Sequence, residues 1–192
     1  MENSFNNISY NTEMEKNKNE KPQIKKGVGF VFEQNPELAN IGTMEQYSEY
    51  LDTIFSDSEV KNIVYHASHN KIENFREGMF GNYFSYSPIK GVFGNVINCA
   101  RLDVKSLLTI PELKDDDEAK IIYDKEYRAY NNPSYISPEG YRSYKYDASL
   151  EVSTVAEEGV QIRVRNPEQI HVLGSEKDLE NFKKFVANKN KA

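Results

Sequence analysis

Cysteine and tryptophan are almost missing from this sequence, and long apolar runs are missing altogether. The 192 residues include one cysteine and no tryptophan, so no disulfide can form within the chain. A lack of disulfides is typical of proteins of the reducing cytoplasm. No apolar run reaches the roughly 18 residues of a membrane-spanning helix, and the first residues lack the apolar core of a secretory signal. We therefore expect a cytoplasmic protein that does not enter a membrane.

Positively charged residues are in the minority. The chain has 24 lysines and arginines against 30 aspartates and glutamates, which gives a formal net charge of −6. Phosphate backbones repel such a chain at long range. We therefore expect no broad nucleic-acid-binding surface, although a local basic groove stays open. Metal and phosphate motifs are also missing, since there is no glycine-rich phosphate loop, no HExxH and no Cys/His metal spacing. His66 and His69 are a conceivable ligand pair, but no nearby thiol completes it. No bound metal is expected.

What the sequence does contain is enough apolar material for one domain. Hydrophobic residues make up 38% and aromatic residues 12%, which supports one core of ordinary size. Residues 1–26 are polar and rich in Asn, Lys and Glu, so we expect a flexible arm there, or a segment that contacts a partner. The predicted domain spans residues 27–188, and residues 189–192 form a frayed tail.

The chain predicts two capped helices and a set of short strands. Thr43 with Gln46 forms a capping box before an apolar stripe that runs to Phe55, and Ser175 with Asp178 caps a last helix. Strands are expected, from apolar runs and alternation, at 27–32, 62–66, 81–85, 92–104, 160–165 and 170–173. An acidic loop at 114–118 and a long loop at 123–146, dense in Tyr, Asn, Ser and Pro, separate the two groups of strands.

Two short motifs stand at a definite separation. Val64-Tyr65-His66-Ala67-Ser68 is followed by Gly81-Asn82-Tyr83-Phe84-Ser85, with Tyr83 17 residues after His66. The order and spacing resemble the ADP-ribosyltransferase superfamily, in the His–Tyr–(Glu/Asp/Gln) branch that includes the poly(ADP-ribose) polymerases. The span 35–185, with its closing stretch 166–175 (NPEQIHVLGS), is similar to the ADP-ribosyltransferase modules of phage and mobile-element polyvalent proteins.

The resemblance implies a fold and a cofactor. It implies an α+β split β-sandwich, with two small antiparallel sheets around an NAD cleft and flanking helices. His66 would hydrogen-bond a ribose hydroxyl of NAD, a task that suits a neutral imidazole. Ala67, at the usual glycine position, would pair its backbone with the nicotinamide amide, and Ser68 would contact ribose. Without the resemblance, a buried structural histidine is the plainer interpretation of His66.

The resemblance also assigns the aromatic and the third catalytic positions. Tyr83 would stack on the nicotinamide, with Phe93, or Tyr86 in reserve, on the other ring face. Counting back eight residues from the glutamine of the closing motif gives Gln161 as the third position. A glutamine keeps an acceptor oxygen but lacks the charge and basicity of glutamate. Glu157 and Glu158, just upstream, are the alternative source of a carboxylate, or simply a solvated turn.

The function that follows is NAD-dependent mono-ADP-ribosylation, with His66, Tyr83 and Gln161 as catalytic residues. The expected acceptor is a bacterial host protein, with a nucleic-acid acceptor disfavoured by the acidic balance, and an anti-defence role such as anti-CRISPR follows by analogy. Two alternatives stay open. One is an inactive binding module of the same fold that blocks a partner, and the other is an NAD-consuming toxin.

Overall fold

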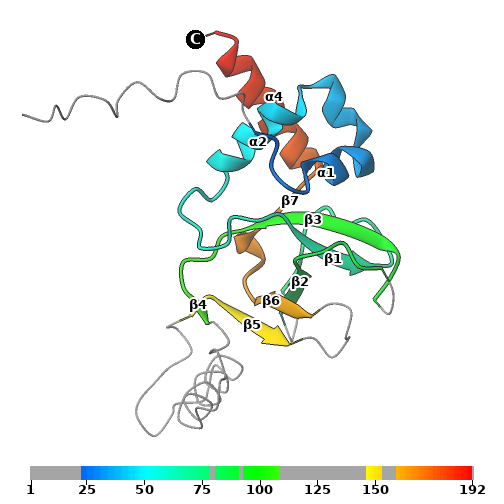
Figure 1. Cartoon of the computed structure of the whole chain (residues 1–192), viewed down its shortest axis with the longest axis vertical. Coiled ribbons are helices and arrows are strands. Elements are labelled where there is room, and N and C mark those ends of the chain that lie inside the picture. The colour runs from blue at the N-terminus through cyan, green and yellow to red at the C-terminus, as the bar shows by residue number, and fades with distance from the viewer. Residues whose placement is uncertain (1–22, 78–80, 91–92, 109–145, 153–158, 192) are drawn as a thin grey trace, which may run out of the picture.

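The chain folds as helices packed on a mixed β-sheet (Figure 1). The structure is a computed structural model that describes residues 23–77, 81–90, 93–108, 146–152 and 159–191, the last two positions of the fourth range without their side chains. The predicted acidic loop, nearly all of the predicted long loop and most of the predicted arm lie outside these ranges. Within them, the α+β class predicted from the sequence is confirmed.

Seven strands form one sheet in the order β4-β5-β6-β2-β1-β3-β7 within the described ranges. All neighbours pair antiparallel except β4 and β5, which are parallel. The five strands predicted after the first helix are confirmed with slightly shifted ends. The observed strands are β1 (Val64–Ser68), β2 (Asn82–Ser85), β3 (Val96–Leu102), β4 (Leu107–Leu108), β5 (Ala148–Val152), β6 (Val160–Val164) and β7 (Ile170–Val172).

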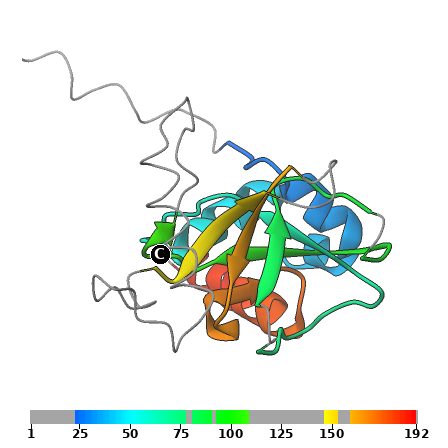
Figure 2. The same ribbon diagram turned by 90° about the horizontal axis from the view of Figure 1, so that it is seen from below.

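The prediction of two separate sheets is wrong. Pairing of Tyr65 with Ser85 joins β1 to β2, and the Ser85 hydroxyl also donates to the Tyr65 carbonyl at 3.3 Å. This single register pair is a narrow link, so the halves on either side of it turn toward each other (Figure 2). Between them lies one apolar cluster that includes Val64 and Leu102 from one half and Phe84 and Ile162 from the other. The sheet therefore encloses a core, as a sandwich does, without being divided.

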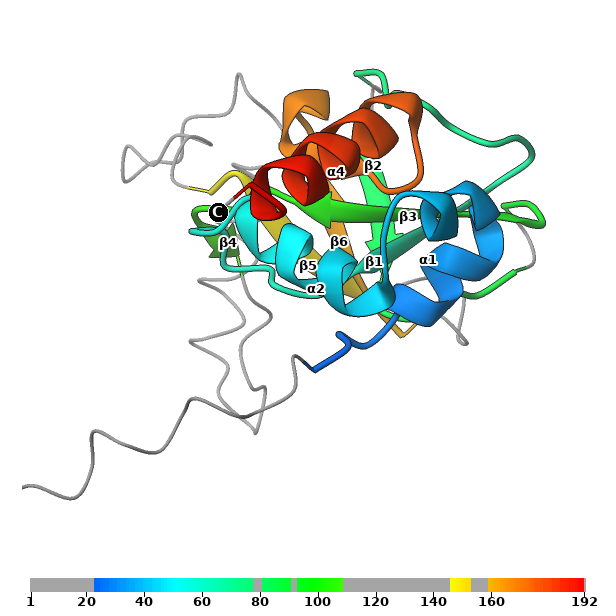
Figure 3. The same ribbon diagram turned by 90° about the horizontal axis from the view of Figure 1, so that it is seen from above.

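The helices cover the opposite face of β1 and β3 (Figure 3). A second cluster there joins Tyr65, Ile97 and Cys99 of these strands to the helices α1 (Val28–Gln34), α2 (Met44–Thr53) and α4 (Glu176–Lys189). Alternation along β1 therefore places Tyr65 among the helices and its neighbours Val64 and His66 on the other face. No helix in the described ranges is both long and apolar enough to cross a bilayer.

The first apolar run is a helix and not the predicted strand. Residues Val28, Val31 and Phe32 are buried at helical spacing, and Gly27 begins the helix with φ +93°. A short apolar run satisfies either periodicity, so packing against α2 and the sheet decides its form. The prediction failed because the run carries no capping side chain, whereas both helices with predicted caps were found.

The two predicted helix caps are confirmed. Thr43 accepts from the Gln46 amide at 3.3 Å while the Gln46 side chain accepts from the Thr43 amide at 2.9 Å, and Ser175 accepts from the Asp178 amide at 3.2 Å. α2 ends at Thr53, however, so the predicted continuation to Phe55 is wrong. Phe55 has φ +50°, which a helix does not allow.

A fully buried carboxylate, Asp178, joins α4 to α2 and β7. Its oxygens accept from the hydroxyls of Tyr47 (2.5 Å) and Tyr50 (3.1 Å), from His171 Nε2 (2.7 Å) and from the Gly174 amide (2.8 Å). Burial, and then the charge of Asp178, raise the pKa of both phenols above the usual range, so both stay protonated and donate. Four donors thus satisfy one buried carboxylate.

The single cysteine is structural. Cys99 lies in β3 against the helices, and burial raises the pKa of its thiol to about 12. Because the thiolate is the reactive form, we expect no reaction with a thiol-specific disulfide reagent at pH 8 in the folded protein. Unfolding in guanidinium should expose one reactive thiol per chain. Rapid stoichiometric labelling of the native protein would contradict the burial.

The two stretches near the ends of the span 35–185, around Asn35 and around Gly174, contact each other. The side chain of Asn35, which ends α1, lies against Gly174 before α4, and a β-carbon built on Gly174 would lie 2.1 Å from Asn35 Cγ. Lys71 Nζ donates to Asn35 Oδ1 and to the Gly174 carbonyl, each at 3.1 Å. The two stretches that carry the family resemblance at its ends therefore have a packing role.

Alanine at position 174 should destabilise the protein. Gly174 has φ +73° and no room for a β-carbon, so Gly174→Ala should lower the free energy of unfolding by roughly 2–3 kcal/mol. Gly29 in α1 is the matched control, because a β-carbon there meets nothing within 4 Å. Gly29→Ala should instead stabilise by about 0.5–1 kcal/mol through helix propensity. Denaturant unfolding of both variants measures the difference, and equal effects would contradict the crowding at Gly174.

Candidate functional site

The His66 imidazole is fixed in the gap between β1 and β2. Its Nδ1 lies 2.8 Å from the Tyr83 carbonyl oxygen. Because a carbonyl only accepts, Nδ1 must carry the proton, so a neutral His66 has its lone pair on Nε2. The ring packs edge-on to Phe75, with centroids 5.1 Å apart, and at a tilt to Phe84 at 5.7 Å. One backbone hydrogen bond and two aromatic contacts therefore set the tautomer and the orientation of the ring.

A buried asparagine holds the end of β1 on its other side. Asn98 pairs with His66 across β1 and β3, and its Nδ2 donates to the His66 carbonyl (3.2 Å) and to Ser68 Oγ (2.8 Å). Its Oδ1 accepts from the Ile72 amide at 2.7 Å. Asn98 thereby ties the strand to the loop that follows it. This loop then supplies Phe75 to the His66 ring.

Tyr83 lies on the face of β2 that is turned away from the enclosed core. It pairs with Arg163 of β6, and the Arg163 guanidinium carbon lies 5.5 Å from the centroid of the Tyr83 ring. This cation–π contact orients the ring. Phe84 and Ile162, the next pair along, point into the core instead. Arg163 is itself buried.

Gln161 shares the face of Tyr83. It pairs with Ser85 in the β2–β6 ladder and with Glu151 in the β5–β6 ladder. Side chains two residues apart on a strand point the same way, so Gln161 lies beside Arg163 and diagonal to Tyr83. The α-carbons of such diagonal neighbours are roughly 7–8 Å apart. Glu157 and Glu158, the alternative carboxylates, lie outside the described residues.

The side chains of the three predicted catalytic residues do not all lie on one face of the sheet. His66 meets Tyr83 at the backbone carbonyl, while its ring packs on Phe84, whose side chain is on the core face of β2. Tyr83 and Gln161 share the other face. The His66 ring therefore lies at the join between the two halves of the sheet, and Tyr83 and Gln161 lie on one half.

Of the other residues predicted to contact NAD, Ala67, Ser68 and Phe93 lie near the end of β1, whereas Tyr86 does not. The Ser68 hydroxyl donates to the Asn70 carbonyl at 2.5 Å in addition to its bond with Asn98, and Ala67 packs toward the helices. Phe93 is 50% exposed, in a turn whose Gly94 lies directly against the Ser68 carbonyl. Tyr86, the reserve for Phe93, lines a different pocket, with lysines.

Three residues of the site were not identified from the sequence, and for two of them the sequence holds a signal. Phe75 lies in a loop with no periodic pattern, so nothing in the sequence indicates its contact with His66. Asn98 sits inside an apolar run, where an amide is unusual and so could have signalled a buried hydrogen-bonding role. Arg163 is two residues from Gln161 in the alternating strand and could have been placed on the same face.

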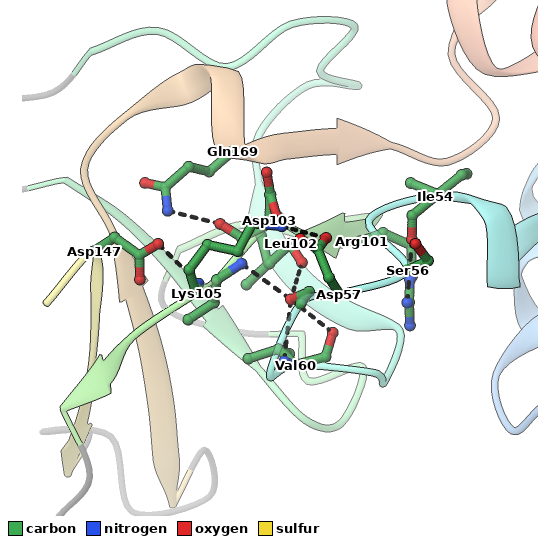
Figure 4. A network of polar contacts seen from close by, with 12 residues as sticks. Ile54, Ser56, Asp57, Val60, Arg101, Leu102, Asp103, Lys105, Asp147 and Gln169 are labelled. Atoms are coloured by element: carbon green, nitrogen blue, oxygen red, sulfur yellow. Dashed lines mark hydrogen bonds and ion pairs between the residues drawn. The ribbon is translucent and has the colours of Figure 1, made fainter.

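Gln169, the glutamine of the closing motif, has a structural role (Figure 4). Gln169 ends the 3₁₀ turn η4 (Pro167–Gln169), and its Nε2 donates to the Asp103 carbonyl at 2.7 Å. The Asp103 amide donates back to the Gln169 carbonyl at 2.8 Å. Next to these residues, both oxygens of Asp147 accept from backbone amides, of Lys105 at 2.8 Å and of Ser106 at 3.0 Å. These bonds fix the chain after β3 against the turn before β7 and against the start of β5.

The described residues contain no group of three or more His, Cys, Asp and Glu side chains that could hold a metal ion. In comparisons with family models, curated proteins and solved structures, nothing matches this chain. Any function assigned to the protein therefore depends on the geometry of the described residues and on the resemblance of the two motifs.

Proposed function

We propose that this protein binds NAD and transfers a single ADP-ribose to a protein. The observation that carries the proposal is the hydrogen bond from His66 Nδ1 to the Tyr83 carbonyl, which joins the two motif strands. It places the lone pair of neutral His66 on Nε2, the form that accepts a hydrogen bond from a ribose hydroxyl. Tyr83 would lie against the nicotinamide ring, and Gln161 on the same face would hold the ribose by its amide.

The proposed reaction breaks the bond between ribose C1′ and the nicotinamide nitrogen. The electron pair of that bond leaves with nicotinamide, the acceptor nucleophile forms the new bond at C1′, and the acceptor loses its proton. The Gln161 amide cannot take that proton, so the proton passes to solvent or to a base of the target. Positioning and electrostatics would provide most of the acceleration. Absence of a carboxylate at Gln161 is consistent with transfer of one ADP-ribose and not with chain elongation.

A bacterial host protein is the acceptor we propose, and interference with host defence is the proposed purpose. The net charge of −6 disfavours an approach to nucleic acid, because phosphate backbones repel an acidic chain. The defence role follows from the motif resemblance alone.

A binding module without chemistry is the second candidate, and one contact favours it. The Arg163 guanidinium lies over the Tyr83 ring, at 5.5 Å from the centroid, on a buried side chain. A nicotinamide would have to use the other ring face or displace the guanidinium. In that case a partner protein would bind without any consumption of NAD.

Incubation of the purified protein with NAD labelled in the adenylate part, with and without bacterial lysate, separates the candidates. Label in protein bands that survives denaturation supports the transferase. Release of free nicotinamide without lysate, with growth arrest on expression, indicates the NAD-consuming toxin. Absence of both, together with no NAD binding by calorimetry, leaves the binding module and overturns the proposal.

A further inference from the structure

A basic pocket lies where the chain enters α1, beside the start of β1. It has a volume of about 290 Å³. The polar side chains in its lining are three lysines, two tyrosines and one asparagine, namely Lys25, Lys26, Lys61, Tyr65, Tyr86 and Asn62. No carboxylate belongs to this lining. In a chain with an excess of acidic residues, this concentration of hydrogen-bond donors and positive charge is a local exception.

The Tyr65 hydroxyl has no hydrogen-bond partner in the described part of the chain. Tyr65 is 6% exposed, and its ring packs edge-on to Phe30 at 5.8 Å among the helices. Its hydroxyl lies next to Gly27, where a β-carbon would come within 2.5 Å of it. Gly27 thus makes room for the hydroxyl beside Lys26. Burial raises the pKa of this phenol, which keeps it a donor.

The three ammonium groups are only partly neutralised. Lys25 pairs with Asp52 at 2.7 Å. Lys61 donates to the Ser56 carbonyl and, after a hydrogen bond from Lys105, its charge helps to lower the pKa of the nearby Asp57 carboxyl. Lys26 is exposed and makes no ion pair with any residue that the structure describes. Lys26 therefore supplies the pocket with a positive charge that no described carboxylate pairs with.

We propose that this pocket binds an oxyanion, specifically the phosphate group of a phosphomonoester. Lysines supply the charge for such a dianion, and charge-assisted hydrogen bonds to phosphate are short and strong. The phenol and amide groups would supply directional donors, and the free Tyr65 hydroxyl would gain the partner that it lacks. The volume suits one phosphate and a small attached group better than an extended polymer.

This site lies on the opposite side of β1 from the His66 ring, but on the face of the sheet that carries Gln161, because Ser85 pairs with both Tyr65 and Gln161. Tyr65 and His66 are neighbours on β1 and point to opposite faces of the strand, toward the helices and toward the enclosed core respectively. Tyr86 contributes to the basic pocket just after β2 has ended.

NMR titration of the full chain with inorganic phosphate, AMP and adenosine tests the assignment. Phosphate and AMP should bind saturably and shift the Gly27 amide and the Asn62 side-chain amide, and adenosine should not. Lys26→Glu should weaken phosphate binding at least about tenfold through charge reversal. Tyr65→Phe should weaken it roughly three- to fivefold through loss of one donor, and Tyr83→Ala should leave it unchanged.

Lys183→Glu is the matched control, because Lys183 is an exposed lysine on α4 and its reversal changes the net charge equally. Its phosphate affinity should stay within about twofold, since distant surface charges are screened. Equal weakening by Lys183→Glu and Lys26→Glu would show a nonspecific charge effect and overturn the assignment. The assignment also fails if phosphate does not bind, or if an oligoglutamate peptide binds where phosphate and AMP do not.

Discussion

Replacement of His66 by alanine should abolish the transfer of ADP-ribose, with a loss of at least about 100-fold. The proposed role of His66 is to hold the NAD ribose in a reactive geometry, and loss of one such positioning contact costs about that much. The Tyr83 carbonyl also loses the hydrogen bond that it accepts from His66 Nδ1 at 2.8 Å. Label transfer from NAD, measured at equal protein concentrations, gives the loss directly.

His69→Ala is the matched control. His69 is exposed three residues further along the chain, so its replacement removes an imidazole without touching the site. We expect full activity from it. The His66 variant must also be shown to fold, because its ring packs against Phe75 and Phe84. A folded His66→Ala protein that transfers label as fast as the parent would remove His66 from the reaction.

Removal of the Asp178 carboxylate should have the largest effect on stability. Asp178→Ala leaves four donors without their acceptor, the buried ones of Tyr47, Tyr50 and the Gly174 amide and the partly buried one of His171. Each unsatisfied buried group costs about 1–3 kcal/mol, and collapse and hydration recover part of the sum. The free energy of unfolding should therefore fall by roughly 3–5 kcal/mol. Denaturant unfolding followed by circular dichroism measures this.

Two further variants separate the buried network from simple loss of an acidic residue. Glu180 lies on the same helix, is exposed, and pairs only with Lys184 in the described structure. Glu180→Ala should leave the unfolding midpoint almost unchanged. Asp178→Asn keeps one acceptor oxygen and should be less harmful than alanine. If Asp178→Ala costs less than about 1 kcal/mol, then the carboxylate does not hold α4 in place.

The elements predicted correctly are those with a local physical cause. α2 and α4 begin where Thr43 and Ser175 can accept from amides three residues on, and these bonds need no distant partner. β6 is predictable because alternation along 160–164 separates a core face from a polar face. The same alternation is enough to predict that Gln161 lies on a strand.

The wrong predictions concern features of the fold that depend on contacts between residues far apart in the sequence. Residues 27–32 are predicted as a strand, and they form a helix because Val28 and Phe32 pack into the cluster under α2. The two predicted sheets are one, because the Tyr65–Ser85 pair joins segments that have no common sequence pattern. Phe75 contacts His66 from a loop whose path depends on Asn98.

Periodicity and capping along the chain by themselves determined a mixed domain with two capped helices and the short strands that carry His66, Tyr83 and Gln161, while the α+β sandwich was implied by the motif resemblance. The tertiary structure alone decided the helical form of α1, the continuous bent sheet, the tautomer of His66 and the buried partners of Asp178. The physical reason is the distance along the sequence over which each kind of interaction acts. Local hydrogen bonds and side-chain alternation depend on residues a few positions apart, whereas burial and strand pairing depend on segments that only folding brings together.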